Sequence, residues 1–478
     1  MRRSGKSTCA NLKYIIFAQI LFNFFRQPLS NRTKPIIMRM RLYTFSFTGF
    51  LLASAAAFGC SKSDEPSVDP TPPPIPEPSI TEPKTGEVLP PWTEGELDIH
   101  SISTGRGETN FYIMPDGTTL LVDAPGVLAT DEYFKSKGDE GATPARPGWG
   151  VSSGTLVARY VKAYAPNNKI DYWLNSHFDI DHMGNYPPDY PSNNSLCAKN
   201  TDGNFWVNGI AEIGTMIPIG KIIDRGYRKP VDRSGENRIA DYIRFIGWSA
   251  RTNGSLYEEA KPGSKTQITM LYNPDKYPNF NIRILCASGV YWTGTGENAN
   301  TYLPSSSAEL QEAKPAENIY SVAFMLNFGN FNLFSGGDLQ YNGRSTYSWK
   351  DAEKPLIPIV RKVEVMKACH HATAYTNSDE LLAVLKPDVV WMNPWRTPHP
   401  NPNTVNRFLA ANSATVLLST NVDPGHKAEL GALADKFSSW NGHIVFRVKT
   451  DGTYKIYILD DNNEERRIAR ILGPYKSR

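Results

Sequence analysis

Hydrophobic and polar positions form two hairpin patterns, one in each half of the chain. Residues 110–123 (NFYIMPDGTTLLVD) contain two β-rich runs separated by Asp116 and Gly117. Asp-Gly between two apolar runs predicts a tight turn between antiparallel strands. Residues 321–338 (SVAFMLNFGNFNLFSGGD) have the same character. The pattern therefore predicts an antiparallel hairpin in each half of the chain.

Patterns of helices and strands alternate after these hairpins. A one-sided apolar face over 153–164 predicts a helix, and the buried run 170–175 predicts a strand. Hairpins combined with such alternation predict an α/β fold of two sheets packed face to face with helices outside. The second half adds the following elements: strands at 282–287, 362–371, 388–393 and 414–419, helices at 379–386 and 404–411, and a final hairpin at 443–458.

The domain boundaries follow from the places where the alternating pattern of helices and strands weakens. The proline-rich run stops near Trp92, so we expect the globular domain to span 92–460, with 461–478 as a C-terminal tail. Periodicity is poor from 186 to about 265, although residues 217–223 are apolar. We therefore expect strands and an elaborated rim at about 186–280.

The N-terminal residues have the layout of an export signal. Residues 38–60 contain two arginines, an uncharged apolar stretch and small residues that end at Cys60, and a proline-rich tether follows to residue 91. This arrangement resembles a bacterial lipoprotein of the Bacteroidetes type, which implies lipid on Cys60 and a location at the outer membrane or cell surface. We assign 1–59 to the signal region, with the true start at Met38 or Met40.

The charge balance changes when the signal region is set aside. Residues 1–59 hold nine of the 51 Lys and Arg residues and none of the 48 acidic ones, so 42 basic residues remain against 48 acidic. A net-acidic body does not have the basic surface of a protein that grips nucleic acid. Nucleic acid is therefore expected as a substrate at most.

One short segment carries most of the candidate chemistry. His177-Phe-Asp179-Ile-Asp181-His182 places two imidazoles and two carboxylates within six residues, where a predicted strand ends in a loop. Such ligands suit borderline cations such as Zn²⁺, Mn²⁺ or Fe²⁺. Alternation puts 177, 179 and 181 on one side and turns His182 toward a neighbouring position. The segment thus predicts two adjacent metals.

This segment, followed by Met-Gly, resembles the HxDxDH signature of metallo-β-lactamase-fold hydrolases, with Asp in place of the second His. Residues 102–126, LFSGGD (333–338) and MKACHHAT (366–373) match further segments in the same order. These segments and the PWRTPHPNP loop (394–402) most resemble the extracellular hydrolase domain of ComEC-type competence proteins. The resemblance implies a four-layer αβ/βα sandwich and a dinuclear site, with Zn or Mn as the expected ions.

The resemblance also implies a role for each matching residue. Asp338 bridges both metals, and Asp181 and Asp338 are counted with the catalytic residues. His399 is expected to contact the substrate or the leaving oxygen. The implied metal ligands are His177 and Asp179 at the first metal and Asp181 and His182 at the second. One of His370 and His371 completes the second site. His370 is favoured, and the other histidine then faces the substrate or supports a ligand.

The implied function is a metal-dependent hydrolase that activates water to cleave phosphodiester or related ester bonds. Residues 183–369 contain no His, so the first metal is oxygen-rich, which argues against a β-lactamase or a thiolesterase. The alternatives are a surface substrate-binding lipoprotein with little turnover, or a lactonase-like hydrolase. Metal content and a substrate screen discriminate among them.

Overall fold

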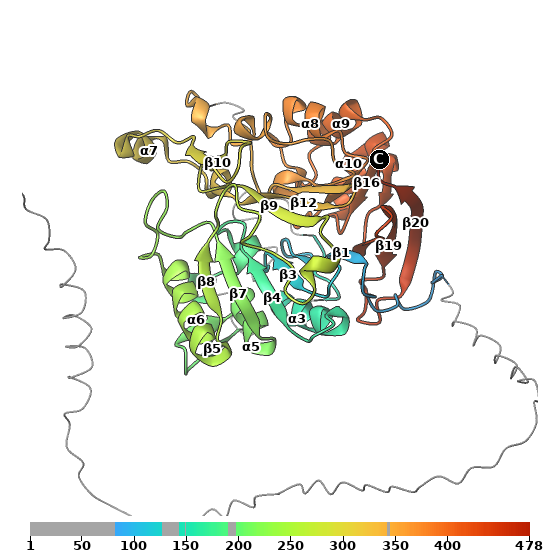
Figure 1. Ribbon diagram of the computed structural model, residues 1–478, viewed down its shortest axis with the longest axis horizontal. Helices are drawn as coiled ribbons and strands as arrows, with labels where there is room; N and C mark the ends of the chain where they lie inside the picture. Colours follow the sequence, from blue (N-terminus) through green and yellow to red (C-terminus); the bar gives the residue numbers. More distant parts are fainter. Residues whose placement is uncertain (1–81, 127–142, 149, 190–196, 342–344) are drawn as a thin grey trace, which may run out of the picture. The chain divides into compact units, whose positions relative to one another are not determined.

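The computed structural model describes residues 82–126, 143–148, 150–189, 197–341 and 345–478 (Figure 1). The signal region, Cys60 and most of the tether lie outside the described residues. The chain divides into two units, Met1–Pro78 and Ser79–Arg478, and all described residues belong to the second. Within them, no helix has the length and apolar character needed to cross a membrane.

The second unit is built on two large mixed sheets and a small hairpin of β5 (Ala198–Asn200) and β6 (Phe205–Val207). The first sheet has the order β20 (Ile468–Lys476), β19 (Thr453–Leu459), β18 (His443–Val448), β1 (Leu97–Ser101), β2 (Asn110–Ile113), β3 (Thr119–Val122), β4 (Ile170–Leu174), β7 (Ile219–Asp224), β8 (Leu256–Glu259). The second has the order β11 (Ala299–Thr301), β10 (Val290–Trp292), β9 (Phe280–Ala287), β12 (Ala323–Phe328), β13 (Phe331–Ser335), β14 (Val365–Lys367), β15 (Val389–Met392), β16 (Val416–Ser419), β17 (Phe437–Ser439).

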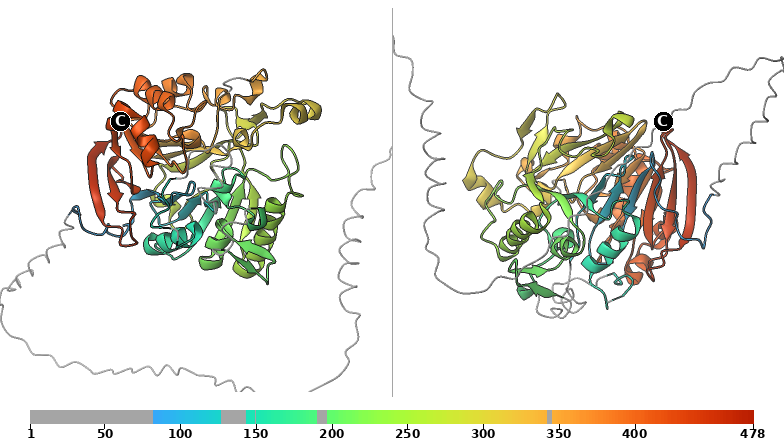
Figure 2. Two further views of the ribbon diagram at one scale, coloured as in Figure 1. Left: turned by 180° about the vertical axis from the view of Figure 1, so that it is seen from behind. Right: turned by 60° about the horizontal axis from the view of Figure 1, so that its bottom comes forward.

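Helices cover the outer faces of both sheets (Figures 1 and 2). The first sheet carries α3 (Ser153–Tyr164), α5 (Ile210–Met216) and α6 (Asn237–Asn253). The second carries α8 (Asp379–Leu385), α9 (Pro402–Ala411) and α10 (Pro424–Glu429), while α4 (Ile180–Met183) and α7 (Ser307–Ala313) are short. Three apolar clusters fill the space between the sheets and beneath each helical layer. The αβ/βα sandwich expected from the sequence is confirmed.

Both sheets change from antiparallel to parallel pairing at a corresponding place. In the first sheet β2 and β3 are antiparallel, whereas β3 and β4 are parallel. In the second sheet β12 and β13 are antiparallel, whereas β13 and β14 are parallel. In sheets of this kind, ligands bind beyond the carboxyl ends of the parallel strands. The candidate ligands follow β4, β13 and β14, so the fold gathers them at that edge.

Two predicted boundaries are corrected. Residues 461–478 are not a tail, because they contain β20, which pairs antiparallel with β19. The domain also begins before Trp92, since Val88 bridges Arg467 and the amide of Gly86 donates to the carbonyl of Ile468. The first sheet therefore ends in a strand that the sequence pattern assigned to the tail.

The interpretation of residues 186–280 as strands and rim is also incomplete. The apolar run at 217–223 is confirmed as β7, a strand of the first sheet. However, the segment also contains α6, a helix of 17 residues. Its buried face includes Asp241 and Ser249 beside apolar residues, and this polar content weakens the periodic signal. Asp241 is accommodated because it accepts a hydrogen bond from the amide of Trp206.

Asp224, at the end of β7, gives a prediction about stability. Its carboxyl accepts bonds from Tyr242, Tyr257 and the amide of Gly226, yet burial raises its pKa to about 6. The folded protein therefore binds this proton more tightly than the unfolded chain, and stability falls as pH rises from about 4 to 6. We expect Asp224→Asn to be more stable than wild type at pH 7.5, by up to about 3 kcal/mol.

Urea unfolding at pH 4 and pH 7.5 tests this expectation. An asparagine can keep the three bonds, since its Nδ2 donates to the Tyr242 hydroxyl while its Oδ1 still accepts. The advantage should therefore vanish near pH 4, where the wild-type carboxyl is protonated. The exposed Asp435→Asn is the control, and it should show no such difference. A variant less stable than wild type at pH 7.5 would contradict the argument.

Candidate metal centre

The loop after β4 supplies four of the candidate ligands. His177 lies in the loop itself, and Asp179 immediately precedes the short helix α4, which carries Asp181 and His182. The loop packs closely against the segment before β2, where the amide of Glu108 donates to the carbonyl of Asp181 at 2.9 Å. Gly107 (φ 119°) makes this approach possible, because a Cβ there would lie 2.3 Å from the same carbonyl oxygen.

Hydrogen bonds to Nδ1 fix the orientation of three imidazoles. The Nδ1 of His182 donates to the carboxylate of Asp123 at 2.8 Å, and the Nδ1 of His371 donates to the carbonyl of Asn393 at 2.8 Å. Ser176 donates its hydroxyl to Asp123 and lies 3.0 Å from the Nδ1 of His177. Each ring therefore turns its Nε2 away from these partners, which is the usual arrangement of metal-binding histidines.

The Nε2 atoms converge on Asp338, which follows β13. The Oδ2 atom of Asp338 lies 3.0 Å from the Nε2 of His182 and 3.2 Å from that of His371. It lies 3.9 Å from the Nε2 of His177. On the remaining sides, His177 is 3.5 Å from Asp179, and His371 is 3.0 Å from Asp181. The structure thus brings together the residues that the sequence predicted for the site.

The geometry corrects the roles expected of His370 and His371. Neither residue ends a strand, because β14 stops at Lys367 and both lie in the turn Cys369–Ala372. His371 is buried with its Nε2 facing Asp181, Asp338 and His182, whereas the Nε2 of His370 lies 3.8 Å from Asp338 and 3.2 Å from the amide of Asn318. His371, rather than His370, therefore has its Nε2 beside Asp181 and His182.

The turn that carries these histidines has an unusual backbone. His370, His371 and Ala372 are all left-handed, with φ of 47°, 54° and 59°, a conformation that costs non-glycine residues of order 1–3 kcal/mol each. The side chain of Asn377 stabilises the turn by accepting from the amide of Cys369 and donating to its carbonyl. Strain held in this way is typical of sites where the direction of a side chain matters.

A buried ion pair lies beneath the cluster. The Nζ of Lys367 is 2.6 Å from Oε2 of Glu108 and 3.5 Å from Oδ1 of Asp338, and it donates to the carbonyl of Gly337. Glu108, His182, Asp338 and His371 are all buried, and each offers a donor atom within 4.8 Å of the others. Since Glu108 is paired with Lys367, it is better suited to hold that lysine than to hold a metal ion.

Opposite charges shift the titration of the central residues. Burial alone would lower the pKa of the His371 imidazole, but Asp338 and Asp181 raise it to about 9. The carboxylates of Asp338, Asp181 and Asp123 likewise raise the pKa of His182 well above its usual value, against the effect of burial. The pKa of Asp338 lies well below its usual range because of the neighbouring imidazoles, despite its burial. The cluster therefore attracts positive charge strongly.

The donor set fits divalent cations. His177 Nε2 and Asp338 Oδ1 are buried without a hydrogen-bond partner among the described residues, and leaving such atoms unpaired is costly. Imidazole nitrogens and carboxylate oxygens are the donors that Zn²⁺ and Mn²⁺ accept. The arrangement can therefore hold metal ions between the two sheets.

His399 lies against this cluster, and its expected contact with the substrate stays a prediction. Its ring stacks on that of His371, with centroids 5.2 Å apart and an interplanar angle of 6°, and it is buried. Burial and the nearby charges of His371 and Arg396 hold its pKa well below the usual value. A neutral ring in this position packs against His371 and helps to fix its orientation.

The sequence alone does not identify the residues that hold the candidate ligands in place. Asp123, Glu108, Lys367 and Asn393 received no role, although each lies next to a motif that was recognised. A polar residue at the carboxyl end of a buried strand is the signal that was available for Asp123 and Asn393. No comparable signal exists for Glu108, because its contact with Lys367 joins positions 259 residues apart.

Comparison with known proteins gives similarity in structure only. No protein-family model matches the sequence, and no curated protein matches it. Among solved structures, the following three are similar to this chain. The metallo-β-lactamase fold protein YhfI from Bacillus subtilis is 10% identical, covers 74% of this chain and 100% of its own, and has a TM-score of 0.34. The metallo hydrolase Igni18 from Ignicoccus hospitalis is 12% identical, covers 74% and 100%, and has a TM-score of 0.29. Zn²⁺-bound PqqB from Methylobacterium extorquens is 11% identical, covers 73% and 99%, and has a TM-score of 0.31.

Proposed function

We propose that this protein is a metal-dependent hydrolase that cleaves phosphodiester or related ester bonds. One observation carries the proposal: three buried imidazoles, each anchored through Nδ1, turn Nε2 toward the carboxylates of Asp179, Asp181 and Asp338. A structural role alone does not require so many titratable groups at one buried point. The export inferred from the sequence, which stays a prediction, would place this activity outside the cytoplasm.

The residues divide into two sets around Asp338. His177 and Asp179 lie on one side of it, and Asp181, His182 and His371 lie on the other. The first set would hold one cation, the second set would hold another, and Asp338 would serve both. When bound, divalent cations lower the pKa of a water molecule and stabilise negative charge on the group under attack. Asp123, Asn393 and Lys367 hold the ligands in place.

A cation near the exposed carboxylate of the site favours an anionic substrate. Asp179 is the most exposed of the central carboxylates, with 35% of its side chain accessible. Burial would raise the pKa of Asp179, but His177 lowers it, and Arg238 lowers it by a smaller amount. Asp179 in turn raises the pKa of Arg233, as do Glu236 and Glu317. Arg233 is ion-paired with Glu236 and Glu317. The Arg238 guanidinium is therefore the group that suits the charged oxygens of a phosphodiester.

A substrate screen with metal analysis tests the proposal. We expect the purified chain to hold zinc or manganese and to cleave a chromogenic phosphodiester faster than a phosphomonoester, a lactone or a β-lactam. EDTA should abolish this activity, and added Zn²⁺ or Mn²⁺ should restore it. Arg238→Gln should raise KM for the phosphodiester without changing KM for the neutral lactone, because only the charged substrate gains from the guanidinium.

Other outcomes favour the remaining candidates. Preferred turnover of the lactone, unaffected by Arg238→Gln, would indicate a lactonase-like enzyme. Substantially less than one transition metal per chain, with no turnover of any substrate, would contradict the proposal and favour a binding protein. Exposed Arg251→Gln on α6 is the matched control, because it removes the same charge from the same helix at its other end.

A further inference from the structure

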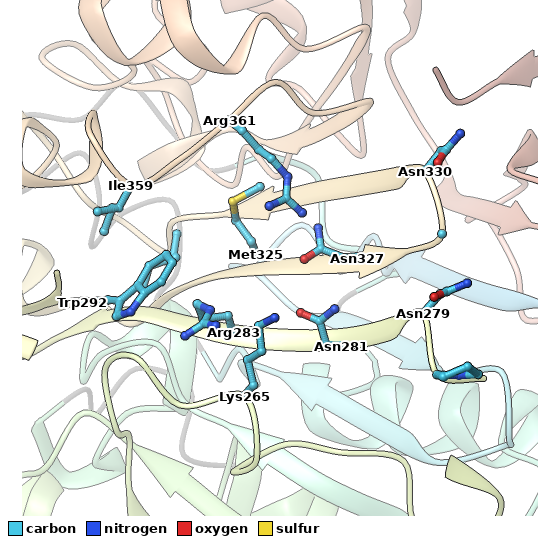
Figure 3. Close-up of a pocket in the computed structure, with 13 residues that line it drawn as sticks. Lys265, Asn279, Asn281, Arg283, Trp292, Met325, Asn327, Asn330, Ile359 and Arg361 are labelled. Carbon is cyan, nitrogen blue, oxygen red and sulfur yellow. The ribbon is translucent and has the colours of Figure 1, made fainter. Parts of the chain in front are cut away.

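A cavity lies on the outer face of the second sheet, and it shares no residue with the metal centre. Its volume is about 500 Å³, and β9, β10, β12 and the segment around Arg361 line it (Figure 3). Pockets of roughly 300–1,000 Å³ are the usual size for small-molecule ligands. The cavity is therefore large enough for a ligand of the size of one sugar.

The polar lining arises from the alternation of side chains along two paired strands. Ile282 and Phe328 point into the core between the sheets, so their neighbours point outward. Asn281 lies directly opposite Asn327, and Arg283 lies opposite Met325. This part of the outer face therefore presents amides and a guanidinium where a covered face would present apolar side chains.

Three cations meet in this cavity, and none of the residues that line it is acidic. Figure 3 shows Lys265, Arg283 and Arg361 directed toward the same space. Burial lowers the pKa of Lys265, and the charges of Arg283 and Arg361 lower it further. The cations therefore repel one another, and an anion placed among them would relieve that repulsion.

The partners of the arginines leave their positive charge largely uncompensated. Arg283 donates to the carbonyls of Gly263 and Gly296 and lies 4.1 Å from the ring of Trp292. Arg361 donates to the amide oxygen of Asn332. The carboxylate of Glu297 acts on Arg283, but it also accepts from the backbone amide of Lys265. The single negative charge of Glu297 thus compensates only part of the positive charge of the three cations.

Neutral groups beside the cations suit the remainder of a ligand. The Oδ1 atom of Asn281 is buried without a hydrogen-bond partner among the described residues. The side chains of Asn279, Asn327 and Asn330 also line the cavity, and Trp292 closes one end of it. Amides can bind the hydroxyl groups of a sugar, and an indole ring offers an apolar surface to the sugar's carbon face.

We infer that this cavity is a second binding site, for a sugar-sized ligand that carries a phosphate or sulfate group. Lys265, Arg283 and Arg361 bind the oxyanion, because charge-assisted bonds from several cations suit its clustered oxygens. Asn281 and Trp292 contact the sugar. The site is independent of hydrolysis, since its residues contact none of the proposed metal ligands.

Isothermal titration calorimetry of the full-length protein tests the inference. The probes are glucose 6-phosphate, glucose 6-sulfate and glucose, titrated into the wild type and into the double variant Lys265→Gln/Arg361→Gln. We expect one or both esters to bind the wild type and glucose not to bind. The double variant should bind the ester about 100-fold more weakly, because two charge-assisted contacts are lost. Its metal content and hydrolytic activity should be unchanged.

The controls separate this site from the metal centre. Binding of an ester that is unchanged in the double variant would place it elsewhere and overturn the inference, as would equal binding of glucose or no binding of any probe. Binding of only one ester supports the inference and identifies the oxyanion as phosphate or sulfate. Arg251→Gln is the charge-matched control and should bind like the wild type. If the wild type binds the ester but hydrolyses none of the screened substrates, the proposed function is contradicted and this inference is unaffected.

Discussion

Replacing Asp338 with alanine should abolish hydrolysis and remove metal from both positions. Its Oδ2 atom lies within 3.2 Å of Nε2 of both His182 and His371, and it is also the carboxylate nearest to Nε2 of His370. No other described carboxylate occupies the centre of the cluster. We therefore expect a loss in kcat/KM of at least about 10³-fold, beyond the 10–100-fold loss typical of a residue that only supports a ligand.

His399→Ala is the comparison for this experiment. His399 stacks on His371 and meets the ring of Trp395 edge-on. Its loss should therefore reduce activity by about 10–100-fold and leave most of the metal bound. Metal content is measured by mass spectrometry beside kcat and KM, and circular dichroism checks that both variants are folded. Equal losses of activity with intact metal in both variants would show that Asp338 is not shared between two ions.

Hydrophobic periodicity predicted most of the fold because the strands near the site are buried on both faces. The strands β4, β13 and β15 consist mainly of apolar residues between polar loops, and such runs are distinctive in a sequence. Strand β20 was missed for the opposite reason. It lies at the edge of its sheet with an exposed, mixed sequence, which resembles a polar tail.

The composition of the site could be predicted, but the direction of its side chains could not. The spacing of His177, Asp179, Asp181 and His182 is local, so the sequence displays it directly. Which of His370 and His371 faces the cluster depends on three left-handed residues and on the two hydrogen bonds between Asn377 and the backbone of Cys369. Three successive non-glycine residues with positive φ are unexpected from sequence. The sequence favours an extended backbone here, which would turn His370 instead of His371 toward the cluster.

That reversal gives the second large prediction. His371→Asn should lose metal from the set that includes Asp181 and His182, together with at least about 10²-fold in kcat/KM, because a lost ligand also misplaces the others. His370→Asn should keep that metal. It should lose less activity, since its ring is 21% exposed and bonds to Asn318. Asparagine is preferred to alanine as the replacement because it tolerates the left-handed backbone at both positions.

Metal analysis beside kinetics distinguishes the possible assignments, because both variants share one turn and one type of substitution. If His370→Asn is the variant that loses metal, the bound state turns the other imidazole toward Asp338, and the roles expected from the sequence return. If neither variant loses metal, His177, His182 and the three carboxylates suffice for binding, and His371 is confined to the reaction itself. The assignment of His371 as a ligand survives only if its replacement lowers metal content and activity together, since His371 alone of the two has its Nε2 within 3.3 Å of Asp181, Asp338 and His182.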